Sequence, residues 1–333
     1  MKLIQLLTLT TLLCAPLNQA QSAQQDVFGE HYYQTNQIQS SLTESGDDYT
    51  FLVVGDWGRN GHFAQRSVAK WMDIVAYQFD ADMIISTGDN FYDNGIASVN
   101  DPYWQTSYEN IYHGPHLFID WYVVLGNHDY RGNWQAQIDY SAISRRWNMP
   151  AQYFDKLISL EEGGSVHLVF LDTSPLNPDY QHEAKYQETQ RQDSKAQLAW
   201  FEQTLKRHKN ADWTIVIGHH PLYSSGKRYG KTTAVRGVIE PLLEQYDVDA
   251  YIAGHEHDLQ HNKPAGSSVE HFVSGGGSEI RPVGQREFTA FAKSSAGFAV
   301  VRVNQQQFTL EFIDDKGEVI YQYALDKNRE SAQ

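Results

Sequence analysis

Short apolar runs and stretches of helical periodicity alternate along the first 250 residues of the chain. Apolar positions within 68–79 recur at helical spacing and predict an amphipathic helix. Residues 134–147 are also expected to be helical, as is a segment that starts after Asp193 or Ser194. From His271 onward, strand signals alternate with turns. Six apolar runs are expected to be strands: 49–54, 83–86, 121–125, 166–171, 213–217 and 250–253. The order of elements predicts an α/β domain of two packed sheets flanked by helices.

The first 23 residues have the pattern of a secretory signal. Lys2 supplies a positive start, a mostly apolar stretch follows, and small residues allow cleavage after Ala20 or Ala23. The stretch is short for a spanning helix, so we expect no membrane anchor. Cys14, the only cysteine, lies inside this segment. We therefore expect an exported protein without disulfides, periplasmic or secreted.

The remaining chain is expected to form one domain. Residues 24–47 are polar and lack periodicity, which predicts a mobile leader. The domain is expected to span 48–326, with 327–333 as a tail. Within it, 173–193 is a long polar segment without apolar rhythm, and loops of that length are usually functional or mobile. Nothing indicates a coiled coil, and a monomer is expected.

Charge excludes one class of partner. The formal net charge is -15. A protein that binds nucleic-acid polymers needs clustered Lys and Arg to contact the phosphate backbone, so we do not expect that function. Small anionic substrates are still compatible with this charge, because bound metal ions dominate the field of a site.

Five short motifs carry the candidate chemistry, and each follows an apolar run that ends in glycine. Each is therefore expected at the point where a strand opens into a loop, which is where open α/β sheets bind ligands. The motifs are Gly55-Asp56-Trp57-Gly58, Gly88-Asp89-Asn90-Phe91-Tyr92, Gly126-Asn127-His128-Asp129, Gly218-His219-His220-Pro221 and Gly254-His255-Glu256-His257.

The side chains in these motifs suit metal ions of mixed hardness. They offer carboxylate, amide, imidazole and phenol groups, and phenolate strongly favours Fe(III). Two adjacent metals indicate in-line attack on a phosphate ester. Taken alone, Asp56 or Asp89 is more often a turn or helix cap than a ligand. His255 and His257 alternate on an extended segment and so point the same way, which by itself is weak evidence for a metal.

The motifs together resemble the metallophosphoesterase superfamily, and within it the purple acid phosphatases of the small tartrate-resistant kind. Most metallophosphoesterases carry Asp-x-His in the first motif, whereas this chain has Asp56-Trp57-Gly58. Tyr92 stands three residues after Asp89, as in purple acid phosphatases. The resemblance extends over residues 49–325. It implies a four-layer α/β/β/α sandwich of two mixed sheets flanked by helices.

The resemblance also implies a division of the metal ligands. Asp56, Tyr92 and His257 would hold Fe(III), and Asp89 would bridge it to the second ion. The second ion, Fe(II), Zn or Mn, would be completed by three residues: Asn127, His219 and His255. His128 is expected to contact substrate or to protonate the leaving group. The alternative is that it only forms a hydrogen bond to a residue that binds a metal.

Three further features have open roles. His220 would either line the pocket or be structural. The basic group Lys227, Arg228, Lys231 and Arg236 would be a positive rim or a solvated loop. In the mammalian relatives a loop over the site represses activity, and 173–193 occupies the equivalent place.

The function implied is a dimetal acid phosphatase that hydrolyses phosphate monoesters, small or on proteins, by attack of metal-bound hydroxide at phosphorus. One alternative is a Mn- or Zn-dependent phosphodiesterase or nucleotide hydrolase of the same superfamily. Another, from a different class, is a non-catalytic iron-binding or redox protein.

Overall fold

The structure is a computed structural model that describes residues 28–42 and 48–327. The predicted signal segment and residues 328–333 of the predicted tail lie outside the described residues. The chain divides after Asn36 into two compact units. The described part of the first contains helix α1 (Glu30–Thr35). Among the described residues, no helix has the length and apolar character needed to cross a membrane.

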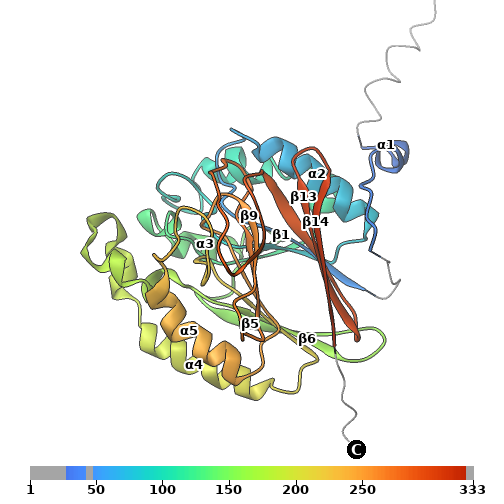
Figure 1. The fold of residues 1–333 in the computed structure, drawn as a ribbon. Coiled ribbons are helices and arrows are strands. Elements are labelled where there is room, and N and C mark those ends of the chain that lie inside the picture. Colours follow the sequence, from blue (N-terminus) through green and yellow to red (C-terminus); the bar gives the residue numbers. More distant parts are fainter. Residues whose placement is uncertain (1–27, 43–47, 328–333) are drawn as a thin grey trace, which may run out of the picture. The chain divides into compact units, whose positions relative to one another are not determined.

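The second unit is built on two seven-stranded mixed sheets (Figure 1). In the first sheet β1, β2, β3 and β4 are parallel, and β12, β13 and β14 extend it on the β1 side as antiparallel strands. Its strands are β1 (Tyr49–Val54), β2 (Met83–Ser86), β3 (Asp120–Val123), β4 (Trp147–Asn148), β12 (Gly297–Val303), β13 (Gln307–Asp314) and β14 (Val319–Asp326).

The second sheet has the order β11-β9-β10-β8-β7-β6-β5. Its central strands β6, β7, β8 and β10 are parallel, and antiparallel strands flank them on both sides. Its strands are β5 (Phe154–Ser159), β6 (Ser165–Phe170), β7 (Trp213–Ile217), β8 (Ala250–Ala253), β9 (Leu259–Asn262), β10 (Glu270–Ser274) and β11 (Thr289–Lys293).

Helices cover the outer faces of both sheets. In the described part of the second unit the α-helices are α2 (Gln65–Gln78), α3 (Gln135–Tyr140), α4 (Ser194–Arg207) and α5 (Thr233–Gln245). One hydrophobic cluster joins the two sheets and also contains residues of α2. A second cluster packs Phe201 of α4 and Ile239 of α5 on Val169 and Val216 of the second sheet, and Figure 1 shows these two helices on that side. This is the predicted four-layer sandwich.

Among the differences between predicted and observed elements, two have a clear physical cause. The helix expected over 134–147 ends at Tyr140, and Trp147 instead begins β4. Trp147 is fully buried in an aromatic cluster, with its ring centroid 4.9 Å from that of Trp104, and this burial overrides the helical pattern. Helix α5 was not predicted, because Gly237 and Pro241 lie inside it and both residues normally indicate a break.

In two segments without apolar rhythm, described residues make specific contacts with the rest of the fold. In the segment expected to be a leader, Ile38 is buried and its N–H donates to Gln78 at 2.9 Å. Residues 173–193 form a connection of three short 3-10 segments, Ser174–Leu176, Pro178–His182 and Ala184–Arg191. Tyr180 and Tyr186 in this connection are buried, and both contact the site described next.

Candidate metal centre

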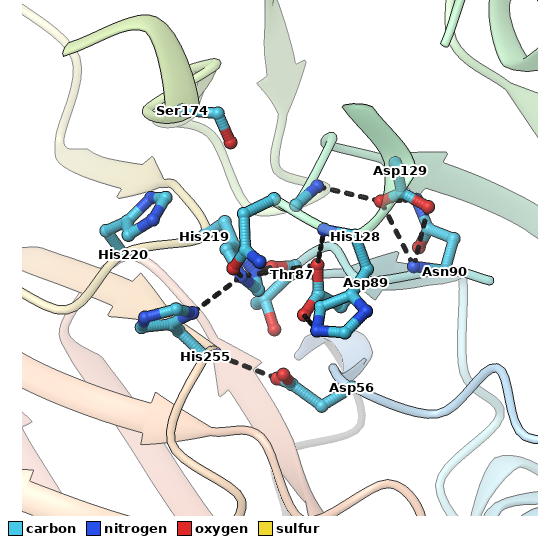
Figure 2. Close-up of polar contacts among 12 residues, drawn as sticks. Asp56, Thr87, Asp89, Asn90, His128, Asp129, Ser174, His219, His220 and His255 are labelled. Carbon is cyan, nitrogen blue, oxygen red and sulfur yellow. Dashed lines mark hydrogen bonds and ion pairs between the residues drawn. The ribbon is translucent and has the colours of Figure 1, made fainter. Parts of the chain in front are cut away.

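Parallel strands of both sheets end at one edge, and the candidate ligands follow them. Asp56 comes after β1, Asp89 after β2 and Asn127 after β3 in the first sheet. His219 follows β7 and His255 follows β8 in the second sheet. Figure 2 shows Asp56, Asp89, His219 and His255 facing one another across a small space. Two sheets therefore contribute to one site.

The backbone at this edge is strained where the ligands stand. Asp56, Asp89 and His255 have φ values of 58°, 52° and 68°, in the left-handed region that costs a residue other than glycine free energy. Gly126 supports Asp89 by close approach, since a Cβ there would lie 2.2 Å from both the amide nitrogen and Oδ1 of Asp89. The sharp turns aim the side chains inward.

The first cluster of donors is centred on the phenol of Tyr92. Its hydroxyl lies 2.8 Å from Oδ1 of Asp56, 2.9 Å from Oδ2 of Asp89 and 3.1 Å from Nε2 of His257. All four side chains are almost completely buried. Atoms that share a metal at about 2.0–2.2 Å lie roughly 3 Å apart, so these separations fit one ion.

The second cluster is centred on Nε2 of His219. This atom is 3.2 Å from Oδ1 of Asn127, 3.0 Å from Nδ1 of His255 and 3.5 Å from Oδ1 of Asp89. Asp89 thus directs one carboxylate oxygen to each cluster. The structure brings together all seven side chains named from the sequence, as two groups that share Asp89.

Electrostatics of the site favour a cation. Burial raises the pKa of Tyr92 well above its usual range, and the charges of Asp56 and Asp89 add to this. Burial also raises the pKa of Asp56. Burial lowers the pKa values of His255 and His257, so these rings are neutral and ready to bind a metal. Adjacent buried acids without an adequate positive partner are costly, and metal ions would offset that cost.

Neighbouring groups fix how two ligands face the site. Nδ1 of His219 lies 2.9 Å from the carbonyl oxygen of Thr87, so Nδ1 carries the ring proton and Nε2 is left to bind. The amide of Asn127 donates to the hydroxyl of Tyr186 at 2.9 Å, which turns its oxygen toward His219. Tyr186 was not identified from the sequence, because nothing in its polar surroundings marks it.

Asp129 holds the loop that carries Asp89. Its buried carboxylate accepts hydrogen bonds from the backbone N–H groups of Asn90 at 3.1 Å, Phe91 at 3.2 Å and Gly126 at 2.8 Å. Figure 2 shows Asp129 and Asn90 on the far side of Asp89 from Asp56. Asp129 therefore positions the Asp89 turn without facing the donor clusters.

His128 lies at the entrance of the site. Its Nδ1 is 2.7 Å from the carbonyl oxygen of Asp93, and its Nε2 is 4.0 Å from Oδ2 of Asp89. Burial lowers its pKa to about 4, although the charge of Asp89 acts in the opposite direction. The ring is 16% exposed. The Nε2 atom therefore faces the donor clusters while the other nitrogen is anchored.

His220, the possible pocket-lining residue, has both ring nitrogens engaged. Nδ1 is 2.8 Å from the hydroxyl of Thr173, and Nε2 is 2.7 Å from the hydroxyl of Tyr180. The side chain is fully buried, and burial lowers its pKa well below the usual range. In this arrangement His220 connects the 173–193 segment to the His219 loop and presents no free nitrogen to a substrate.

Of the basic group after His219, one residue reaches the ligands. Nε of Arg228 donates to Nε2 of His255 at 2.9 Å. Lys227 and Lys231 are exposed. The guanidinium of Arg236 lies 4.7 Å from the centroid of the Tyr223 ring. The backbone N–H of Arg228 is held by Glu256, which stands between the two histidines of the last motif.

A second arginine, not identified from the sequence, lies on the first cluster. The guanidinium of Arg59 is 3.7 Å from the centroid of the Tyr92 ring. It is held there by Asp93 at 2.6 Å and Glu279 at 2.8 Å. Glu279 in turn lies 3.7 Å from Nδ1 of His257. A positive charge stacked on the phenol favours its ionised form.

Comparisons with known proteins agree with this geometry. The model of the calcineurin-like phosphoesterase family matches residues 49–259. Purple acid phosphatase 3 of Arabidopsis thaliana is 35% identical over 312 residues, which are 89% of this chain and 83% of that protein. This chain belongs to the purple acid phosphatases. Human tartrate-resistant acid phosphatase type 5 is 32% identical over 295 residues, 83% of this chain and 90% of that protein.

A solved structure has the same fold in a different role. GAP50, described as the anchor in the inner membrane complex of Plasmodium, superposes with a TM-score of 0.73 and 25% sequence identity. The match covers 85% of this chain and 90% of that one. In this purple acid phosphatase homologue, buried His and Asp groups are placed as a binuclear metal site requires, with Asp56, Asp89 and His219 as one set.

The role of Asp129 gives a first prediction. In Asp129→Asn an amide would replace the carboxylate that accepts hydrogen bonds from backbone N–H groups. The NH2 group of the amide cannot accept a hydrogen bond. We expect the Asp89 turn to loosen. Metal affinity should then fall roughly 10- to 100-fold, as when other residues that hold a metal ligand in place are replaced. Metal content after dialysis measures this. Asp139→Asn, the same change at an exposed site on α3, is the control. Unchanged metal content in Asp129→Asn would contradict the assignment.

Proposed function

We propose that this protein is a dimetal acid phosphatase that hydrolyses phosphate monoesters. The observation that carries the proposal is the convergence of the Tyr92 phenol with Asp56, Asp89 and His257 within 3.1 Å. A phenol in such a set favours Fe(III), whereas the Asn127, His219 and His255 donors suit Fe(II), Zn or Mn. When bound, the pair of ions would supply Lewis acidity toward the phosphate oxygens and lower the pKa of water.

The side chains at the entrance have roles that do not depend on metal geometry. His128 is held by the carbonyl of Asp93, and its Nε2 faces the clusters. We assign its imidazolium form, which the pKa of about 4 favours only in acid, to donate a proton from Nε2 to the leaving or phosphoryl oxygen. Leaving-group protonation has most effect for alcohols of high pKa, which are the usual products of phosphate monoesters.

Arg228 is proposed to bind the substrate phosphate. Its hydrogen bond to His255 requires an unprotonated Nε2, so the ring proton is on Nδ1, which faces His219. If Nδ1 of His255 binds a metal, its proton must move to Nε2, where it would face the Arg228 N–H. Two donors cannot bond each other, so the guanidinium would be released. A released guanidinium beside the second cluster matches a phosphate oxygen pair.

The alternatives differ in what they require of the site. A Mn or Zn phosphodiesterase needs no phenolate ligand, and a non-catalytic iron or redox protein needs no entrance acid. GAP50, which has this fold, is described as an anchor. The complete donor set, together with His128, favours a hydrolase here.

The substrate and setting follow from the same proposal. We propose a monomer that acts on small or protein-bound phosphate monoesters outside the cytoplasm, with no nucleic-acid polymer as partner. The net charge of -15 would repel anionic polymers over the surface, whereas the arginines at the site act locally.

Visible absorption with metal analysis tests the centre itself. The purified protein should carry iron and show a broad visible band, because phenolate donates charge to Fe(III). Tyr92→Phe should remove or strongly shift that band and reduce monoester hydrolysis. Tyr103→Phe, an exposed position, should retain both. A colourless wild-type protein with two Mn or Zn ions would instead favour the phosphodiesterase, and diesters would then be tested first.

His128→Ala should lower kcat by about 100- to 10,000-fold, the range typical of a lost general acid. The loss should be larger for an alkyl phosphate than for p-nitrophenyl phosphate, because nitrophenolate leaves without protonation. Metal content should not change. His113→Ala removes an exposed histidine and should have no effect. Equal losses for both substrates would assign His128 to the phosphoryl oxygen, and full activity would remove it from the reaction.

Arg228→Ala should raise KM and the inhibition constant for inorganic phosphate by roughly 10- to 100-fold, the value of one or two charge-assisted hydrogen bonds. Calorimetric titration with phosphate measures the same loss without turnover. Lys231→Ala, in the same basic group but exposed, should change neither constant. If Arg228→Ala binds phosphate as well as wild type does, its contact with His255 is only structural.

A further inference from the structure

A second group of metal-binding side chains lies outside the proposed catalytic centre. Asp155 is on β5, His167 is on β6 and His208 follows the last residue of α4. Oδ2 of Asp155 is 3.1 Å from Nε2 of His167 and 3.6 Å from Nε2 of His208. The three donor atoms lie within 4.8 Å of one another. Two adjacent strands and the end of a helix therefore direct nitrogen and oxygen donors at one point.

Strand register explains how the first two side chains meet. Asp155 pairs with Val169, and His167 pairs with Leu157, so Asp155 and His167 are diagonal neighbours on one face of the β5–β6 pair. Val169 on this face packs in the cluster that contains α4 and α5. The ring of His208 then approaches from the end of α4, with its centroid 4.5 Å from that of His167.

This group is separate from the catalytic centre. His208 precedes β7, whereas His219 follows it. The five-residue strand between them spans roughly 15 Å. The group lies at the edge of the second sheet, because β5 is its terminal strand. A metal here would not share ligands with the catalytic pair.

The surroundings suit a cation with access to water. His167 is fully buried, while the side chains of Asp155 and His208 are 21% and 22% exposed. The C-terminal end of α4 carries the negative end of the helix dipole, which favours a cation beside His208. The positive charge of Arg207, the residue before His208, opposes binding of a cation. It contributes, after burial, to lowering the pKa of His167, and a neutral imidazole is the form that binds metals.

We propose that Asp155, His167 and His208 form a third divalent-metal site, which takes a borderline ion such as Zn²⁺. Ligand atoms on a tetrahedral zinc are separated by roughly 3.3–3.6 Å, close to the separations seen here. Water would occupy the remaining position on the exposed side.

The site would connect an edge strand to the end of a helix. Asp155 and His208 are 53 positions apart in the chain (208 minus 155), and closing a long loop limits the freedom of the unfolded chain. The only cysteine is Cys14, so no disulfide can serve this purpose elsewhere. The proposal concerns stability and is independent of the proposed reaction.

Zinc loading of the metallated protein tests the site. The protein with its catalytic metals in place is equilibrated with ZnCl₂, desalted and analysed for total metal. Wild type should carry three ions per chain, whereas His208→Ala and Asp155→Asn should carry two. Saturating zinc should raise the melting temperature of wild type by roughly 5 °C relative to these variants. Both substituted side chains are partly exposed, so the variants should fold.

His113→Ala removes an exposed histidine elsewhere and should retain the third ion. Co²⁺ in place of Zn²⁺ gives a spectroscopic measure, since tetrahedral Co²⁺ absorbs in the visible. The visible absorption that accompanies binding of a third equivalent of Co²⁺ should be present in wild type and absent in His208→Ala. Equal zinc content and equal melting shifts in wild type, His208→Ala and Asp155→Asn would overturn the proposal.

Discussion

Two carboxylates, Asp56 and Asp89, are buried so close together that both bond to the hydroxyl of Tyr92. In water such charges would be screened, but in the interior each raises the cost of ionising the other. A purely apolar or neutral surrounding would leave one of them protonated. The donor geometry is therefore satisfied best by cations at the two clusters, and the loops at this edge are arranged around that requirement.

Much of the local structure can be understood as support for those two side chains. Both stand in left-handed backbone conformations, which are retained only when the surroundings over-determine them. Asp129 binds the amides of the Asp89 turn. Trp57, directly after Asp56, is fully buried and donates to Ser86 at 2.9 Å. The strain at the ligands is thus offset by packing and hydrogen bonds one or two residues away.

The strand ends and the candidate ligands that follow them could be predicted from the sequence, because both depend on local patterns. Each apolar run ending in glycine located a ligand, and Asp56 or Asn127 needed no tertiary information. Tyr186 and Arg59 were different, because they reach the second and the first cluster, respectively, from segments without periodicity. Arg228 was named only as one of a basic group, and its contact with His255 could not be predicted. Trp147 was misassigned for a related reason, since a helical pattern gave way to burial among other aromatic rings. Long-range packing therefore determines the structure of segments that the local sequence pattern does not specify.

The side chains that contact the candidate ligands come from the least regular parts of the fold. Asn127 is oriented by Tyr186, and His220 is held by Tyr180, so the 173–193 segment bonds to one member of the second cluster and to the residue that follows His219. His255 contacts Arg228 in another loop. Fold alone does not determine reaction. In this chain, specificity must arise where these loops meet the ligands, because the strands fix only the positions of the donors.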